Sequence, residues 1–140
     1  MLAYPVTIFE DDGWYIVESV DFPNVTAQGE TREQALEDAV NAIATGIAMC
    51  IRNGQPLPIS SPATAGQPVV ILPTQIVLKA LLHGEMLRQK VTKADLARRL
   101  GWRQTQAARL LDVKHASKLD AIDQAFEALG RKLDVSVRSA

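Results

Sequence analysis

The chain has few residues of the kinds that form disulfides or bind metals. Its 140 residues include one cysteine, Cys50, and two histidines, His83 and His115. A single cysteine cannot form an internal disulfide, which fits a reducing compartment, and its apolar neighbours indicate a small buried side chain. The histidines lie far apart and have no cysteine or carboxylate at ligand spacing. We therefore expect no metal site and no cofactor.

Long hydrophobic runs are also absent. No stretch reaches the 18 consecutive apolar residues that a membrane-spanning helix needs, and the first residues lack the basic leader of a secretory signal. The glycines Gly54, Gly66 and Gly84 belong to no phosphate-binding pattern. We expect a cytoplasmic protein without a membrane partner.

Charge is divided between the two halves. Residues 1–72 contain nine acidic and two basic side chains, a net charge of −7, whereas the other 68 residues contain 13 basic and seven acidic ones, a net charge of +6. A basic surface attracts polyanions and an acidic one attracts basic proteins, so two kinds of partner are indicated. Residues 88–118 hold nine bases against two acids, which is typical either of a phosphate-binding surface or of a solvated helical one.

The first half predicts a small sheet with one helix. Alternating or β-rich runs indicate strands over residues 2–9, 14–17 and 25–28, and Gly13 suits a tight hairpin between the first two. Thr31 and Gln34 form a capping box at the start of a helix over residues 32–52. Its apolar stripe consists of Leu36, Val40, Ile43, Ile47 and Ile51.

The chain after this helix predicts a loop and a returning strand. Residues 54–68 are rich in proline, glycine and serine, so neither a helix nor a central strand can persist there. Residues 69–72 form a short apolar run that we expect to rejoin the sheet. The first domain, residues 1–72, is then βββαβ, with a sheet face or edge left available to a partner.

Residues 73–140 predict a second, helical domain, so the fold class is α+β. We expect helices over residues 74–89, 93–100, 104–111 and 118–129, the last one stopped by Gly130. The tail then switches to a period of two. Its apolar side consists of Leu133, Val135 and Val137. A lone strand needs a partner, and the same strand of a second chain is the simplest, giving a homodimer or a higher oligomer such as a tetramer.

Residues 92–112 have the layout of a helix-turn-helix, with Gly101 in the turn. The inner faces of the two helices are formed by Leu96, Ala97, Leu100, Ala107, Leu110 and Leu111. The side chains expected to face the major groove of DNA are Arg103, Gln104, Thr105 and Arg109. Those expected to hold backbone phosphates are Lys93, Lys114 and Lys118. The alternative is an ordinary pair of packed helices.

Both halves resemble known families. Residues 74–130 look like the DNA-binding domain of the Xre and lambda repressor-like family. The first half resembles the HicB antitoxins through a Gly-aromatic strand, a Pro-containing turn, a G-[DE]-T step and an E-x-A-L helix start. These motifs are Gly13-Trp14-Tyr15, Asp21-Phe22-Pro23, Gly29-Glu30-Thr31 and Glu33-Gln34-Ala35-Leu36. Asn24 stands where a glycine commonly follows the proline, and asparagine also tolerates a left-handed conformation.

The resemblance implies a function for each half. The first half would be a degraded RNase H-like domain that binds and masks a HicA-type toxin, a small basic ribonuclease, and the second would bind double-stranded operator DNA and repress the operon. We assign the toxin contacts to Trp14, Glu18, Asp21 and Phe22. Occupying the toxin's RNA surface requires no chemistry by this chain.

Two other functions remain as alternatives. One is a stand-alone transcription regulator whose first domain senses a small ligand. The other is a nuclease, which would need several carboxylates that converge on two metal ions. Asp11 and Asp12 are adjacent, and Glu10, Glu18 and Asp21 carry no supporting signature. We therefore predict no catalytic residues and no enzyme.

Overall fold

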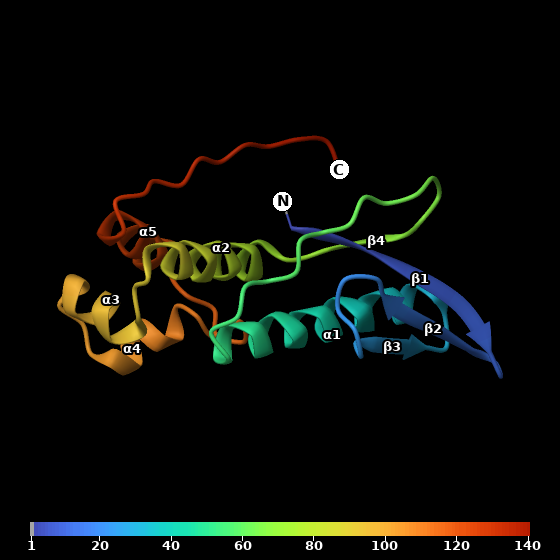
Figure 1. The fold of residues 1–140 in the computed structure, drawn as a ribbon. Helices are drawn as coiled ribbons and strands as arrows, with labels where there is room; N and C mark the ends of the chain where they lie inside the picture. The colour runs from blue at the N-terminus through green and yellow to red at the C-terminus, as the bar shows by residue number, and fades with distance from the viewer. Residues whose placement is uncertain (1) are drawn as a thin grey trace.

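The computed structural model describes residues 2–140 and confirms the α+β class. The sheet, with the first helix along it, lies at one end of the molecule and the last three helices lie at the other, with the second helix between them (Figure 1). The strands are β1 (Ala3–Asp11), β2 (Trp14–Ser19), β3 (Thr26–Gly29) and β4 (Val69–Ile71). The helices are α1 (Arg32–Arg52), α2 (Thr74–Gln89), α3 (Lys93–Leu100), α4 (Gln104–Arg109) and α5 (Leu119–Ala128).

The sheet is antiparallel, with strand order β3-β2-β1-β4. The expected hairpin between β1 and β2 is confirmed: Asp11 pairs with Trp14, and the two residues between them, Asp12 and Gly13, have φ of 50° and 80°. Two positive φ values define the turn whose twist matches that of the strands. Asn24 also has a positive φ of 70°, as its side chain permits.

The first bond of the capping box predicted for α1 is confirmed, but the second is not, because the Gln34 side chain binds the residue before the N-cap and not Thr31 itself. The Gln34 backbone N–H donates to Thr31 Oγ1 at 3.1 Å, and Gln34 Oε1 accepts from the Glu30 N–H at 3.1 Å. The buried stripe starts one residue earlier than the sequence predicted, because it contains Ala35 and Ala39 where we expected Leu36 and Val40. The buried residues of α1 are Ala35, Ala39, Ile43, Ile47 and Ile51.

Small residues explain the shift of the stripe. A Cβ placed on Gly29 of β3 would lie 2.4 Å from the backbone nitrogen of Ala35, so helix and strand are in backbone contact there. A glycine opposite an alanine permits this approach, whereas leucine at the same place would hold α1 away from the sheet. Leu36 and Val40 instead lie half-buried beside the contact.

The proline-rich segment of residues 54–68 is fixed to the sheet by hydrogen bonds. The buried Tyr4 hydroxyl donates to the Pro58 carbonyl at 3.1 Å, and burial raises the pKa of Tyr4 to about 12, so the phenol stays protonated. The Ser61 backbone N–H donates to Asp21 Oδ2 at 3.1 Å. The segment then enters β4, which pairs with β1 and confirms the returning strand.

Helix α2 connects the two halves. It contacts α1 on one side and α5 on another, and apolar residues from both halves form one buried cluster. His83 Nε2 donates to the carbonyl oxygen of Gln55, just beyond α1, at 2.7 Å. Pro73, the expected boundary, lies immediately before α2, where its carbonyl accepts from the Ile76 and Val77 N–H groups.

The tail forms no strand in the single chain. Residues 131–140 have no regular secondary structure and extend away from α5 (Figure 1). Val135 and Val137 are 80% and 96% exposed, and Leu133 is half-buried. An isolated strand has no neighbour for its backbone hydrogen bonds, which explains why the period-two pattern alone does not produce one.

Two helical glycines provide a matched test of this packing. A Cβ on Gly46 would lie 2.8 Å from Phe22 Cδ1, whereas a Cβ on Gly84 would have nothing within 4 Å. Gly46→Ala should lower the free energy of unfolding by about 1–3 kcal/mol, as overpacking does. Gly84→Ala should raise it by about 0.5–1 kcal/mol, because alanine favours the helix. Urea unfolding measures both, and equal effects would contradict the packing of Phe22 against α1.

Candidate nucleic-acid and partner interfaces

Helices α3 and α4 are joined by a short, well-defined turn. The Asp95 backbone N–H donates to Thr92 Oγ1 at 3.1 Å and the Thr92 N–H donates to Asp95 Oδ2 at 3.0 Å, which caps the start of α3. Gly101 ends α3 with a φ of 69°. The expected inner face is confirmed, with five of its residues buried and Leu100 half-buried. Helix α4 ends at Arg109, two residues before the predicted end.

The seven basic or polar side chains expected to contact DNA are all exposed. Arg109 and Lys118 line one shallow groove between α4 and the start of α5, together with His115 and Trp102. The Gln106 side chain caps the start of α4, because its Oε1 accepts from the Arg103 N–H at 2.9 Å. The arrangement gathers cationic side chains beside α4, which is what a polyanion requires.

The basic surface is smaller than the sequence indicated. Three of the nine bases in residues 88–118 are engaged with groups of the protein itself: Arg88 with Glu85, Arg98 with Asp95, and Arg99 with the Ala128 carbonyl. The remaining six include every basic residue assigned above to DNA contacts. These six bases are Lys90, Lys93, Arg103, Arg109, Lys114 and Lys118.

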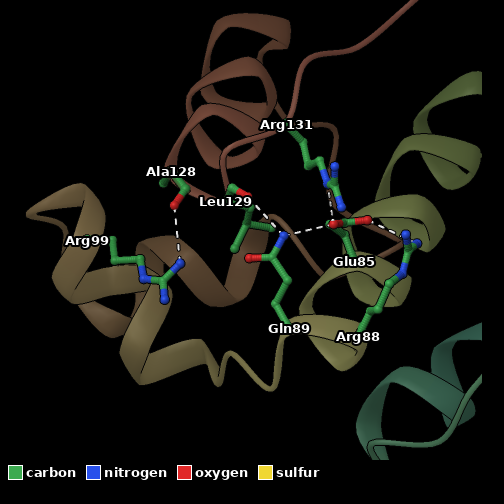
Figure 2. A network of polar contacts seen from close by, with 7 residues as sticks. All are labelled: Glu85, Arg88, Gln89, Arg99, Ala128, Leu129 and Arg131. Atoms are coloured by element: carbon green, nitrogen blue, oxygen red, sulfur yellow. Dashed lines mark hydrogen bonds and ion pairs between the residues drawn. The ribbon is translucent and has the colours of Figure 1, made fainter.

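A polar network holds the end of α5 against α2 (Figure 2). Glu85 is buried and forms ion pairs with Arg131 at 2.6 Å and Arg88 at 3.0 Å. The Arg131 and Gln89 hydrogen bonds hold the pKa of the Glu85 carboxyl below its usual value. Gln89 Nε2 also donates to the Leu129 carbonyl at 2.9 Å. The point where the tail leaves α5 is therefore fixed.

Helix α4 is supported from inside by a residue that sequence reasoning missed. Lys79 of α2 is fully buried, and its Nζ donates to the Arg109 carbonyl and to Ser117 Oγ, both at 2.8 Å. Burial lowers the pKa of this ammonium group. A lysine in an amphipathic helix normally indicates a solvated surface, so no sequence signal distinguishes it.

The sheet has one covered face and one open face. Helix α1 covers the face that carries Val17, Ala27 and Val70, which are buried. Strand register and alternation place a second set on the opposite face, because Asp11 pairs with Trp14, Phe9 with Ile16, and Ala3 with Ile71. We call this set the open sheet face; it comprises Phe9, Trp14, Ile16, Glu18, Val69 and Ile71. Four of its large apolar side chains are more than 40% exposed, a pattern that is typical of interaction surfaces.

Of the four residues assigned to toxin contacts, two lie on the open sheet face and two do not. Trp14 and Glu18 are exposed on the open sheet face. Asp21 is half-buried and accepts from Ser61, and Phe22 is only 5% exposed. The assignment of Phe22 as a surface contact is therefore corrected: its ring packs edge-on against the ring of Tyr4, with centroids 4.9 Å apart, and belongs to the core.

Four members of the open sheet face were missed. Phe9, Ile16, Val69 and Ile71 are apolar and alternate with the core-facing positions of the same strands. Ile16, Val69 and Ile71 belong to short continuous apolar runs, which are also typical of a strand buried on both faces, and Phe9 stands opposite the alternating apolar residues of its strand. Only the position of α1 shows which of the two faces is open.

The carboxylates of the first half do not converge. Glu10 and Glu18 lie on opposite faces of the sheet, since Glu10 pairs with Tyr15 and Glu18 with Thr7. The Glu10 carboxylate raises the pKa of the Tyr15 phenol beside it. Among residues 2–140, no group of three or more histidine, cysteine or acidic side chains is arranged to hold a metal ion. Within the same residues, no helix is long and apolar enough to span a membrane.

Comparison with known proteins decides the family. The family model described as a HicB_like antitoxin of bacterial toxin-antitoxin systems matches residues 3–81. The chain belongs to the HicB-like antitoxin family. Its resemblance to HicB antitoxins is thereby confirmed, and the antitoxin is 33% identical to Antitoxin HicB of Escherichia coli K12 over 96% of this chain and 98% of that protein.

Other HicB relatives match over a similar extent. Antitoxin HicB 1 of Photorhabdus laumondii is 32% identical over 97% of this chain and 87% of that protein. Antitoxin HicB of Pseudomonas fluorescens Pf0-1 is 31% identical over the whole of this chain and 97% of that protein. The family match ends at residue 81, inside α2. It thus spans the sheet, α1 and the first half of α2.

Proposed function

We propose that this HicB-like antitoxin neutralises a HicA-type ribonuclease toxin with its acidic first half and represses its own operon with α3 and α4. The observation that carries the proposal is the separation of two surfaces at opposite ends of the molecule. One is the open sheet face in the half with a net charge of −7, and the other is the basic surface around α4. Masking the toxin requires no catalytic residue.

The open sheet face offers apolar side chains that would stabilise the complex with the toxin and negative charge that would attract it. Phe9 and Trp14 offer aromatic side chains of the kind that anchor protein interfaces. Glu18 lies on the same face, within an acidic half that attracts a basic protein from a distance. Residues 1–72 would thus provide the contacts, and α1 supports the sheet from its other face.

The toxin interface can be tested on two residues of the open sheet face. Trp14→Ala should weaken toxin binding by about 2 kcal/mol or more, a factor of about 30 in Kd, because exposed aromatic anchors carry much of the binding energy. Glu18→Arg should slow association. Isothermal titration with the toxin encoded beside this gene measures the first effect, and stopped-flow mixing the second.

The matched control is Asp120→Arg, which makes the same charge change at an exposed position of α5, away from the sheet. It should leave the Kd nearly unchanged. If Trp14→Ala and Glu18→Arg bind the toxin as the wild type does, the open sheet face is not the toxin interface.

The second half has the composition and geometry of a DNA reader. We propose that α4 enters the major groove, where arginine bonds guanine and glutamine bonds adenine in bidentate fashion. The base-reading residues would be Arg103, Gln104, Thr105 and Arg109. The phosphate-binding residues would be Lys93, Lys114 and Lys118. His115 shares the groove beside Arg109.

The two classes of contact give different results in binding assays. Arg103→Ala or Gln104→Ala should cost about 1–3 kcal/mol at the operator and relax base preference there, whereas Lys93→Ala should weaken all sequences alike and reduce the salt slope by about one. Fluorescence anisotropy with DNA from upstream of the operon, at several salt concentrations, separates the effects. Unchanged operator binding by both Arg103→Ala and Gln104→Ala would show that α4 does not read the bases.

We propose that the tail assembles the DNA-binding form. Residues 132–138 would pair with the same strand of a second chain and bury Leu133, Val135 and Val137, giving a dimer or a tetramer. The operator would then be an inverted repeat, with half-sites roughly 34–36 Å apart or a multiple of that.

Truncation after Arg131, which keeps the ion pair between Arg131 and Glu85, tests the tail. The shortened antitoxin should lose operator affinity at least about tenfold, because each subunit then binds alone, and should still bind the toxin. Analytical ultracentrifugation gives the stoichiometry. Undiminished operator affinity with unchanged stoichiometry would contradict the pairing.

A further inference from the structure

Helix α4 is too short to hold its own shape. It contains six residues, Gln104–Arg109, fewer than two turns. An isolated helix of this length does not form in water, since nucleation costs more than so few hydrogen bonds return. The direction in which α4 presents its side chains must therefore be set by contacts with other elements.

The C-terminal end of α4 is held by the ammonium group of Lys79. Nζ donates to the Arg109 carbonyl, the last one of α4, at 2.8 Å. The same Nζ donates to Ser117 Oγ at 2.8 Å, on the segment that leads into α5. A positive charge at a helix C-terminus also interacts favourably with the helix dipole. Lys79 therefore fixes both the position and the axis of this end.

A neighbouring side chain on α2 reinforces the contact. Gln75 lies one turn before Lys79, so the two share a face of α2. Gln75 Nε2 donates to the Ser117 carbonyl at 2.8 Å, and Gln75 Oε1 accepts from the Ser117 N–H at 3.2 Å. His83, one turn after Lys79, binds the Gln55 carbonyl in the first half. Gln75 and Lys79 thus hold the end of α4 and the segment after it against α2, and His83 holds α2 against the first half.

The two hydrogen bonds that Lys79 donates are directional. Burying an ammonium group is costly unless it is hydrogen-bonded, and an apolar side chain of similar length would fill the same space at lower cost. The two bonds of Lys79 have fixed acceptors, so they define an orientation that apolar packing would leave free. Arg109, whose carbonyl is held, carries one of the side chains proposed to read DNA.

We infer that Lys79 is a positioning residue for operator recognition, which orients α4 from inside the protein without contacting DNA. The inference rests on the proposed DNA-binding function of α4. It assigns the specificity of the operator contact partly to α2, a helix whose first half lies within the segment that defines the antitoxin family.

The experiment uses the full-length antitoxin and Lys79→Met, which keeps the length of the side chain and removes its donors. Hydrogen exchange without DNA reports the order of α4 directly. Amides of residues 104–118 should exchange about ten- to a hundredfold faster, the change expected when one or two charge-assisted hydrogen bonds are lost. Amides of α1 should keep their rates. Arg52→Met removes the same charge from an exposed position on α1 and should change neither.

Operator binding gives the second readout. Lys79→Met should raise the operator Kd about tenfold and reduce discrimination against an operator with one substituted half-site, while toxin binding stays at the wild-type level. Ser117→Ala leaves the bond to the Arg109 carbonyl in place, so it should loosen residues 104–118 less than Lys79→Met does. This variant also keeps the test valid if Lys79→Met does not fold.

The outcomes separate the inference from the function on which it rests. Wild-type antitoxin that binds no DNA would contradict the proposed function, whereas hydrogen exchange would still report whether Lys79 orders α4. Unchanged exchange in residues 104–118 would overturn the inference. Faster exchange spread evenly over the chain, or lost affinity without lost discrimination, would also overturn it, because either result indicates general support of the fold.

Discussion

The position of α4 and of the tail relative to the sheet depends on the burial of α2 between the two halves of this antitoxin. One side of this helix packs on α1 and the proline-rich segment, and another packs on α5. It carries three buried polar or charged groups, Lys79, His83 and Glu85, each hydrogen-bonded or ion-paired to a different part of the chain. Apolar packing brings the halves together, and these bonds select one arrangement.

The polar contacts of α2 are complete, as a buried position requires. Within residues 2–140, every buried side-chain nitrogen or oxygen has a hydrogen-bond partner. A buried polar group without a partner would destabilise the fold, whereas a paired one adds modest stability and strict geometry. The division of the chain into two oppositely charged halves therefore coexists with a junction that is not a flexible linker.

Much of the fold could be predicted from the sequence, because its signals are local. The hairpin at Gly13, the N-cap at Thr31 and the turn at Gly101 each depend on a few adjacent residues, and all are present. The buried position of Phe22 and the order of the strands depend on contacts between distant residues. A motif gives no information about which side of a strand a helix will cover.

The residues of the candidate sites also divide into those that local sequence signals predict and those that depend on distant contacts. The exposed positions around α4 followed from helical periodicity, and Trp14 and Glu18 from a family motif and its strand. Lys79 could not be identified, since a lysine four residues from a glutamine is typical of a solvated helix. The tail forms no strand in the single chain, so the pairing that its pattern predicts stays a prediction.

The open sheet face has a thermodynamic consequence for the unbound antitoxin. Phe9, Trp14, Val69 and Ile71 remain in contact with water whenever the protein is alone, although burying them would release free energy. Any partner that covers them binds the folded state alone and draws the folding equilibrium toward it by mass action. If a partner covers this face, the fraction of the antitoxin that is folded therefore rises with the concentration of that partner.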